Sequence, residues 1–591
     1  MDSLSQKKCL GFLALAMSFS EVEADVVINE LMARNRGAHT NAAGDDRADW
    51  IELHNNGGLP VDLTGWHLTD DPFNLAKWTF PSKSIPAGGY LLVYADSESL
   101  SEISGELHTN FSLSTDGEFV ALVGADGSSV VDSIEVYEYS PGQLGFPVQT
   151  ENISYGRNVS SGFSFFEAST PGAVNSGGAS DFVADTNFDH DRGFYSAPFD
   201  LVISSNTADA EIYYTLNGDE PDTGSTLYSG PITISETATV RARAYKSGLY
   251  PTNIDTHSYI FVADVVQQSP TGNERPTPEW PGFDVNGQKM QYGMDPDITQ
   301  DVRYADLVDD ALLAIPTISL VTDLDHLFDA SNGIYVNANR EGNLWERVTS
   351  VELLNPDGTK GFQENAGLRV RGGASRSDNN PKHAFRLRFR REYGASRLEY
   401  KMFGEDGADS FNGVDLRCAQ TPSFNFHQPT QNTHLRDLFS RDMQLACGQP
   451  STRGDHYHLY INGVYWGMYQ TQENIEGDFA QDYLGGDKDD FDVIEKKKHG
   501  YSIDGNEDAY AELWGITNDG YASNANYYKA QGLNPDGVTP NPAYPKLLDV
   551  DNLMDYMLIT YYTGEKDGPA SVWATVNNYA TIINRVNPDG S

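Results

Sequence analysis

Basic residues are scarce in this chain of 591 residues: 40 Lys and Arg stand against 85 Asp and Glu, a formal charge of −45. A general nucleic-acid-binding protein needs a basic surface for the phosphate backbone, so this balance excludes one. It favours a soluble protein that faces cations or a basic substrate. Hydrophobic residues make up 39% and aromatics 11%, which is enough for folded cores and excludes a disordered polyanion.

Cysteine is nearly absent, with only Cys9, Cys418 and Cys447 in the chain. This count excludes a disulfide scaffold and a cysteine-based zinc module. Cys418 and Cys447 can pair in an oxidising compartment only if the fold brings them together. Long apolar runs are lacking too, because no segment reaches about 18 uninterrupted apolar residues. We therefore expect no transmembrane span.

The N-terminus resembles an export signal. Lys7 and Lys8 precede the apolar run CLGFLALAMSF, and Val22 and Ala24 supply small residues at the positions of a cleavage site. The alternative is a buried N-terminal helix. The pattern predicts a signal peptide over residues 1–24 and a protein that is secreted or held in the cell envelope.

Residues 26–175 are predicted to form a β-sandwich. Short alternating runs such as VVINELM, DWIELHN and YLLVYAD are separated by Gly, Pro, Asn and Asp. The segment resembles a lamin-tail domain through INELMARN, DWIELHNNG, VDLTGWHLTDD, KWTFP, FSLSTDGE and STPGAVN. The resemblance implies an immunoglobulin-like sandwich that binds another molecule or acts as a spacer.

Four acidic residues of this segment are candidate Ca²⁺ ligands, because Ca²⁺ prefers carboxylate oxygens. They are Glu30, Asp49, Glu52 and Asp70. The alternative is that they are solvated residues at strand ends.

A second β-rich segment covers residues 185–262, after a linker over 176–183. It resembles the small chitobiase/hexosaminidase C-terminal type of β-sandwich through IYYTLNGDEPDTGSTLYSGPI and TATVRARAYKSGLYPT. The resemblance implies an accessory module, and the partners we expect for the two β-modules are a glycan or an envelope protein. A glycan hydrolase is a weaker hypothesis, because no paired carboxylates can be placed in a cleft.

Residues 263–313 are rich in Pro, Gly, Asp and Gln and are predicted to be a linker. Residues 314–591 mix strand patterns, such as GLRVRGG and AFRLRFR, with helical ones and predict an α+β unit. In THLRDLFSRDMQLA the helical spacing predicts an amphipathic helix with one apolar face. That face would consist of Leu435, Leu438, Phe439, Met443 and Leu445.

The charge of this unit is uneven. From Arg369 to Lys401 ten basic residues face three acidic ones, a net charge near +7 in an acidic protein. Gly372 and Gly373 follow the strand pattern LRVR, and glycines let backbone N–H groups approach phosphate oxygens. The window predicts a site for a nucleotide polyphosphate. The alternative is a hairpin whose basic face pairs with acidic neighbours.

A second candidate site lies near the C-terminus. An apolar helical run from Leu553 to Tyr562 breaks at Gly564, and Asp567 follows in a DGP loop. An Asp that accepts a hydroxyl proton and a nearby Asn that binds Mg²⁺ is what phosphoryl transfer needs. The alternative is a plain DGP turn with an Asn cap further on.

The third unit resembles the CotH kinase family of atypical protein kinases. The matching pieces are GLRVRGGASR, PKHAFRLRFRREYG, HLRDLFSRDMQLACG, LYINGVYWGMYQTQENIEGDF, YLGGDKDDFDVIEKK and TGEKDGPASVW with the later NN. The resemblance implies a protein-kinase-like fold. It also implies ATP- and Mg²⁺-dependent phosphorylation of Ser or Thr in a secreted or envelope protein.

Site residues follow from matching these motifs one by one. The resemblance implies that the RGGAS turn faces phosphate, that Lys382 with Arg386 behind it pairs with phosphate, and that Glu473 is the acidic residue after the hinge-like strand. The alternative for Glu473 is a helix N-terminal carboxylate. The resemblance also implies a catalytic base and a metal-binding Asn. The whole candidate set is Arg371, Gly372, Gly373, Ser375, Lys382, Arg386 and Glu473 for the nucleotide, Asp567 for catalysis, and Asn578 or Asn577 for the metal.

The sequence stops at NPDG-Ser591, a turn before the strand that the resemblance expects to carry a second metal-binding Asp. This predicts a kinase-like domain truncated at its C-terminus and inactive as printed. The full expectation is a multidomain protein with two all-β immunoglobulin-like sandwiches and an atypical kinase domain. The alternative is an envelope adhesion or scaffold protein with a pseudokinase domain.

Overall fold

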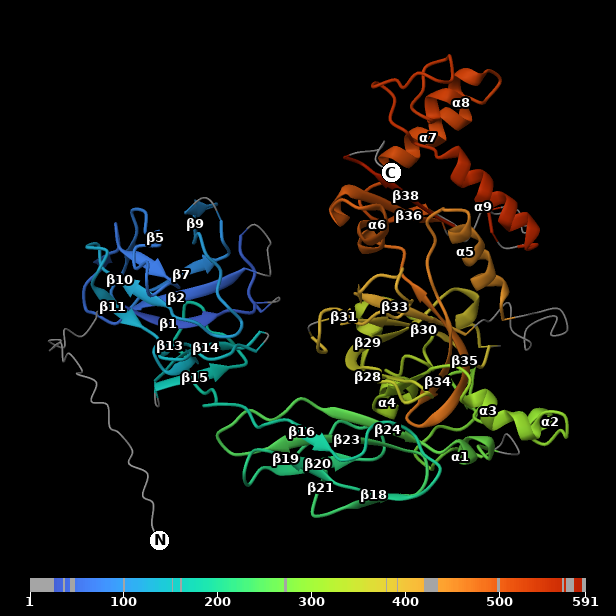
Figure 1. Ribbon diagram of the computed structural model, residues 1–591, viewed down its shortest axis with the longest axis horizontal. Coiled ribbons are helices and arrows are strands. Elements are labelled where there is room, and N and C mark those ends of the chain that lie inside the picture. Colours follow the sequence, from blue (N-terminus) through green and yellow to red (C-terminus); the bar gives the residue numbers. More distant parts are fainter. Residues whose placement is uncertain are drawn as a thin grey trace, which may run out of the picture. The chain divides into compact units, whose positions relative to one another are not determined.

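The computed structural model describes residues 26–35, 38–42, 48–98, 101–150, 152–159, 162–269, 274–378, 380–390, 392–418, 434–496, 500–565, 568–569 and 579–586. The chain forms two compact units, one of residues 1–182 with 247–250 and the other of residues 183–246 with 251–591 (Figure 1). In the described part of the chain no helix is long and apolar enough to cross a membrane. The predicted signal peptide, 1–24, lies outside the described residues.

The first unit is the predicted β-sandwich. One sheet has the order β15-β14-β1-β2-β7-β9-β8 and the other β11-β10-β4-β5. The strands of the first sheet are β1 (Val26–Met32), β2 (Asp49–Asn55), β7 (Tyr90–Ala95), β8 (Glu102–Ile103), β9 (Glu106–His108), β14 (Ser154–Asn158) and β15 (Gly162–Phe166). Those of the second are β4 (His67–Thr69), β5 (Trp78–Thr79), β10 (Ala121–Val123) and β11 (Val130–Ser133). Ile28 and Leu53 of one sheet and Leu68 and Leu122 of the other share one buried core, so the two sheets pack face to face.

The second unit begins with another small sandwich. Its main sheet has the order β17-β24-β23-β20-β21. The same segment also forms two separate two-stranded sheets, β16-β19 and β18-β22. The strands are β16 (Thr186–Phe188), β17 (Gly193–Phe194), β18 (Phe199–Leu201), β19 (Ile203–Ser205), β20 (Glu211–Thr215), β21 (Thr226–Leu227), β22 (Ile232–Ile234), β23 (Ala238–Tyr245) and β24 (Asp255–Ile260). Val240, Ala242 and Ala244 alternate along β23 and supply its apolar buried face, while Thr239 and Arg241 are buried on the other face.

A closed barrel of seven strands follows, in the order β27-β28-β29-β30-β33-β35-β34. The strands are β27 (Thr317–Val321), β28 (Arg347–Leu354), β29 (Gln363–Arg371), β30 (Ala384–Arg388), β33 (Gly413–Arg417), β34 (His456–Ile461) and β35 (Val464–Glu473). Leu368 and Val370 point into the barrel core, while Arg369 and Arg371, which alternate with them along β29, stay on the outside. The barrel therefore presents a charged outer face.

Residues 263–313, predicted to be a linker, are part of the folded second unit. They form α1 (Val262–Val266), the pair β25 (Asp284–Val285) and β26 (Gln288–Lys289), α2 (Pro296–Thr299) and α3 (Val308–Leu312). Trp280, Met290 and Tyr292 are buried in the barrel core. Proline and glycine here shape an ordered segment whose few large side chains supply the packing.

The chain ends in helices and a small sheet. The helices are α5 (Arg436–Ala446), α6 (Gly477–Leu484), α7 (Asp508–Asn518), α8 (Asn524–Ala530) and α9 (Val550–Tyr562), and the sheet β37-β36-β38 joins Gly500–Asp504, Phe491–Lys496 and Tyr579–Asn584. The break predicted after α9 is confirmed, because Gly564 has a φ of +66°. This α+β organisation after two sandwiches confirms the predicted fold class.

The apolar face predicted for α5 is only partly buried. Of its five residues, Leu435 at the N-cap and Phe439 are exposed, at 64% and 43%, and the other three are half-buried. Asp437 and Arg441, one helical turn apart, pair with each other, and Asp437 also pairs with Arg417 of the barrel. Charge pairs therefore join α5 to the barrel alongside its apolar residues.

Candidate functional site

The outer face of β29, β30 and β33 carries a row of charged residues at neighbouring register positions. Arg386 lies directly opposite Asp415, and Arg371 and Arg417 alternate with buried residues on their own strands. In Figure 1 the helices α5 and α6 lie on the side of the barrel where β30 and β33 run. Ion pairs from both helices to the barrel strands confirm this contact.

Asp415 is the centre of this row. Arg386 donates to both of its carboxylate oxygens, at 2.6 and 3.0 Å, and Arg371 approaches within 3.1 Å. Burial opposes a charge on Asp415, which is 2% exposed, but Arg371 and Arg386 outweigh burial and hold its pKa below the usual value. The carboxylate therefore stays ionised and fixes both guanidinium groups.

A second ion pair joins the barrel to α5. Arg417 Nη1 lies 2.5 Å from Asp437 Oδ2, and Arg441 and Gln470 donate to the same carboxylate at 2.9 and 3.1 Å. Burial would raise the pKa of Asp437, but Arg417 and Arg441 hold it at about 2. The side chain of Arg417 is 35% exposed.

Most of the basic window is paired with acidic residues from elsewhere in the chain. Arg388 binds Glu476 at 2.5 Å, Arg397 binds Asp478 at 2.7 Å and Arg376 binds Glu341 at 3.1 Å. This pairing is the alternative that the sequence left open. The groups that can still serve a polyphosphate are the partly exposed Arg371, Arg386 and Arg417, whose guanidinium forks match phosphate oxygens. The role of Arg371 and Arg386 in nucleotide binding stays a prediction, and Arg417 was not among the predicted residues.

The RGGAS turn is a tight, self-bonded turn at the end of β29. Gly372 has a φ of +94°, and a Cβ there would lie 2.2 Å from Ser375 Oγ. Ser375 Oγ donates to the backbone oxygen of Arg371 at 2.9 Å. Gly373 leads into a short 3-10 helix, Ala374–Arg376. Gly372 is thus required by both backbone conformation and space.

Lys382 contacts the barrel core. Its Nζ donates to the backbone oxygen of Gln291 at 2.6 Å and lies 3.9 Å from the centre of the Trp466 ring. Burial lowers the pKa of Lys382 to about 7. No carboxylate among the described residues forms an ion pair with Lys382, and its predicted contact with phosphate stays a prediction.

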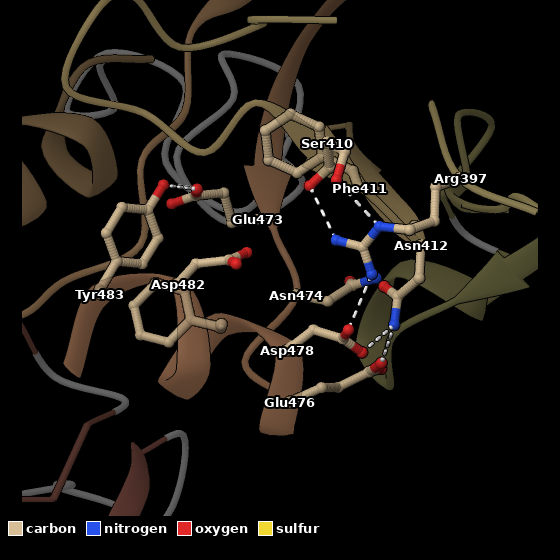
Figure 2. Close-up of a pocket in the computed structure, with 12 residues that line it drawn as sticks. Arg397, Ser410, Phe411, Asn412, Glu473, Asn474, Glu476, Asp478, Asp482 and Tyr483 are labelled. Carbon is tan, nitrogen blue, oxygen red and sulfur yellow. Dashed lines mark hydrogen bonds and ion pairs between the residues drawn. The ribbon is translucent and has the colours of Figure 1, made fainter. Parts of the chain in front are cut away.

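Glu473 ends β35 and ties that strand to α6. It accepts a hydrogen bond from the hydroxyl of Tyr483 (Figure 2) and another from the backbone N–H of Arg453. Burial raises its pKa, and these two donors only partly offset the rise. Beside it, both polar atoms of the Asn474 amide are buried without a partner among the described residues.

The pocket drawn in Figure 2 is small and polar. It has a cavity volume of about 20 Å³, and roughly 10–15 Å³ is needed for a single water. Arg397 and Asp478 form an ion pair across it at 2.7 Å. The pocket therefore has room for a water molecule and not for a nucleotide.

The catalytic and metal-binding predictions, Asp567, Asn577 and Asn578, lie outside the described residues. The strand that follows them is described: β38 begins at Tyr579, which pairs with Lys496 of β36. Glu495 of β36 acts electrostatically on Arg371 and Arg386. The segment after Asn578 is thereby linked through β36 to the charged face of the barrel.

In the described part of the chain, no group of three His, Cys, Asp or Glu side chains is placed to hold a metal ion. All four proposed Ca²⁺ ligands bind other groups of the chain. Asp70 pairs with Lys77 at 2.5 Å, and Asp49 accepts from Asn35 N at 3.2 Å. Glu30 accepts from Thr170 N at 3.1 Å, and Glu52 accepts from Asn29 Nδ2 at 2.7 Å. The two thiols, Cys418 and Cys447, are not joined in a disulfide.

Three residues of the charged face were missed by the sequence reasoning: Asp415, Arg417 and Asp437. The pattern GVDLR places Asp415 and Arg417 on one side of a strand, and Asp437 and Arg441 are spaced i, i+4 in a helix. These spacings show shared faces. They cannot show that the two faces meet, because the contact between β33 and α5 is a tertiary contact that no spacing within one element records.

Comparison with known families agrees with this architecture. Three family models match the chain: Lamin Tail Domain over residues 20–138, Chitobiase/beta-hexosaminidase C-terminal domain over 190–256, and CotH kinase protein over 368–585. No curated protein matches the chain. The third match contains the barrel strands β30 and β33, helix α5 and the sheet of β36 to β38. The chain carries a lamin tail domain, a chitobiase-type C-terminal domain and a CotH kinase domain, in that order.

Proposed function

We propose that the chain is an exported atypical protein kinase that transfers the γ-phosphate of ATP to Ser or Thr of a secreted or envelope protein. The observation that carries the proposal is the Arg417–Asp437 ion pair inside the segment that matches the CotH kinase model. Protein kinases need an ion pair between a Lys on a strand of the small lobe and a Glu on the following helix, and an Arg–Asp pair supplies the same two charges. Arg417 of β33 and Asp437 of α5 stand in this relation.

The residues available fit a polyphosphate. Guanidinium groups bind phosphate oxygens through two parallel hydrogen bonds, and Arg371, Arg386 and Arg417 lie on one face of the barrel. ATP bound there would supply the phosphoryl group, and Mg²⁺ would offset its charge. Asn578, or Asn577, is the residue we assign to the metal.

Each protein group has a defined task in this proposal. Asp437 holds the guanidinium of Arg417 in place, and Asp415 does the same for Arg371 and Arg386. Asp567 orients the substrate hydroxyl and accepts its proton as phosphate is transferred. Positioning and charge supply most of the rate in phosphoryl transfer, since the protein forms no covalent bond itself.

Export and the substrate class rest on sequence. The residues 1–24 have the features of a signal peptide, and the two β-modules are the parts that we expect to hold a glycan or an envelope protein. A kinase that carries its own binding modules can meet its substrate at the cell surface.

Transfer of labelled phosphate tests the proposal. The full chain is incubated with γ-labelled ATP, Mg²⁺ and a Ser/Thr-rich acceptor, next to Asp567→Ala and the control Arg303→Ala, whose side chain is 70% exposed. Because the chain as printed is expected to lack the second metal-binding Asp, the assay uses the chain continued beyond Ser591. We expect incorporation by that chain and by the control, and its loss in Asp567→Ala. ATP binding without transfer would favour the pseudokinase scaffold, and equal transfer by Asp567→Ala would reject the mechanism.

A further inference from the structure

The first unit carries a groove that the proposed kinase reaction does not use. It has a cavity volume of about 320 Å³, near the lower end of ligand clefts, which run from about 300 to 1,000 Å³. Its lining includes Phe73, Phe119, Tyr139, Leu144 and Glu135. A groove of this size takes one or two side chains of a larger partner.

Phe73 forms one wall of the groove and is 87% exposed. Its loop is nevertheless fixed: Phe73 N–H donates to Asp71 Oδ1 at 2.8 Å, and Thr69 Oγ1 donates to the backbone oxygen of Asn74 at 2.9 Å. Lys77 anchors the end of the loop to Asp70 at 2.5 Å. An aromatic ring held in water by an ordered loop is typical of an anchor at an interface.

The floor and the opposite wall are continuous with packed structure. Phe119 belongs to a buried cluster with Ala121 and Val123, against which Tyr139 packs. Tyr139 lies in β12 (Tyr137–Ser140), and Leu144, which is 46% exposed, lies in the paired β13 (Gln143–Gly145). The groove is therefore preformed, which lowers the cost of ordering when a partner binds.

Charge identifies the kind of occupant. Residues 26–182 contain 21 Asp and Glu against six Lys and Arg. Near the groove, Asp71, Glu135 and Glu138 form no ion pair with any residue in the described ranges. A cationic partner would meet this rim without having to displace a competing Lys or Arg.

We propose that this groove binds an extended segment of another protein in which an apolar side chain is flanked by Lys or Arg. The apolar side chain enters between Phe73, Tyr139 and Leu144, and the flanking cations meet Glu135, Glu138 and Asp71. The proposal is independent of the kinase reaction, since its residues all belong to the first unit.

Peptide binding to the full-length chain tests the proposal. The probe is a fluorescein-labelled extended peptide that alternates lysine with leucine, and its anisotropy is followed during titration. Phe73→Ser should weaken binding at least about tenfold, the loss of one good aromatic anchor. The matched control is Leu59→Ser, because Leu59 is also exposed, at 77%, and does not line the groove. Glu135→Gln should weaken binding less and should reduce its salt dependence.

Two further peptides separate the groove from simple charge attraction. A lysine–serine peptide should bind at least about tenfold more weakly than the lysine–leucine peptide, because it lacks the buried apolar group. A glutamate–leucine peptide should not bind. Equal binding by the lysine–serine peptide, equal loss in Leu59→Ser and Phe73→Ser, or no saturable binding of the lysine–leucine peptide below about 1 mM would each overturn the proposal.

Discussion

Arg417 Nη1 and Asp437 Oδ2 lie 2.5 Å apart and join the outer face of the barrel to helix α5. The pair connects two elements that are separated in sequence by a segment outside the described residues, 419–433. Arg417 also donates to Gln472 Oε1 at 3.0 Å. Its guanidinium is thus oriented from two directions, as a group that must meet a phosphate requires.

Arg417→Lys should weaken ATP binding although the charge is kept. Arg417 holds Asp437 and Gln472 through the single nitrogen Nη1, and a lysine ammonium has no second terminal nitrogen to offer a phosphate while it holds both partners. We expect the dissociation constant for Mg·ATP, measured by titration calorimetry, to rise by about tenfold or more. The control Arg303→Lys, far more exposed, should leave it unchanged. Unaltered affinity in Arg417→Lys would remove Arg417 from the nucleotide site.

Asp415→Asn should destabilise the barrel. The change leaves Arg371 and Arg386 half-buried without their shared carboxylate, and breaking a buried pair in this way costs about 3–5 kcal/mol. Hydrogen exchange of peptides from β30 and β33 should report the loss locally. Glu405→Gln breaks only the exposed pair with Lys401. The free energy of local opening that the same exchange measures should change by less than about 1 kcal/mol. Similar effects of the two variants would contradict the central role of Asp415.

The first unit should lose stability as the pH rises from about 4.5 to 7 and beyond. Burial raises the pKa of Glu52 to about 7, and it also raises the pKa of Glu30, its partner across β1 and β2. A raised carboxyl pKa means that the folded state holds its proton more tightly. The stabilisation is therefore complete at low pH and falls as the proton is lost, by at most about 3 kcal/mol for Glu52.

Glu52→Gln checks this sign. The amide keeps an oxygen for the bond from Asn29 but cannot titrate. The protection of β1 and β2 peptides against exchange, corrected for the intrinsic exchange rate, should therefore lose the part of its pH dependence that Glu52 supplies and keep the part from Glu30. Asp126→Asn is the matched control: hydrogen bonds from Ser129 hold the pKa of exposed Asp126 at about 2, well below the range tested. Unchanged pH dependence in Glu52→Gln would mean that another group titrates.

Trp280→Ala should destabilise the second unit, because Trp280 is buried in the barrel core and truncating a core Trp costs about 3–5 kcal/mol. The thermal midpoint of the second unit should fall measurably. Trp514→Ala, at a side chain that is 58% exposed, should change stability by about 0.5 kcal/mol or less. Equal midpoints for the two variants would show that residues 263–313 act only as a connector.

Strand patterns and turns carried most of the fold prediction. The alternation in GLRVRGG and AFRLRFR predicted β29 and β30, and Gly564 predicted the end of α9. The prediction of a linker over residues 263–313 failed, because the composition of this segment shows its Pro and Gly content but not the burial of Trp280 and Tyr292.

The site was harder to predict than the fold. The basic window pointed to Arg371 and Arg386 in the charged face, yet it also suggested Lys382, which contacts Trp466. Spacing along the chain gives no information about which acidic residue each base meets. Asp415 and Asp437 could not be predicted, because their importance comes from tertiary pairing with Arg386 and Arg417.

Photolabelling with an azido analogue of ATP, followed by mapping of the labelled peptides, tests the position of the proposed site most directly. The account predicts labelling that ATP suppresses within the CotH-matched segment, residues 368–585, and loss of that labelling in Arg417→Ala. Label that ATP does not suppress, or label confined to residues 26–182 or 185–262, would contradict it.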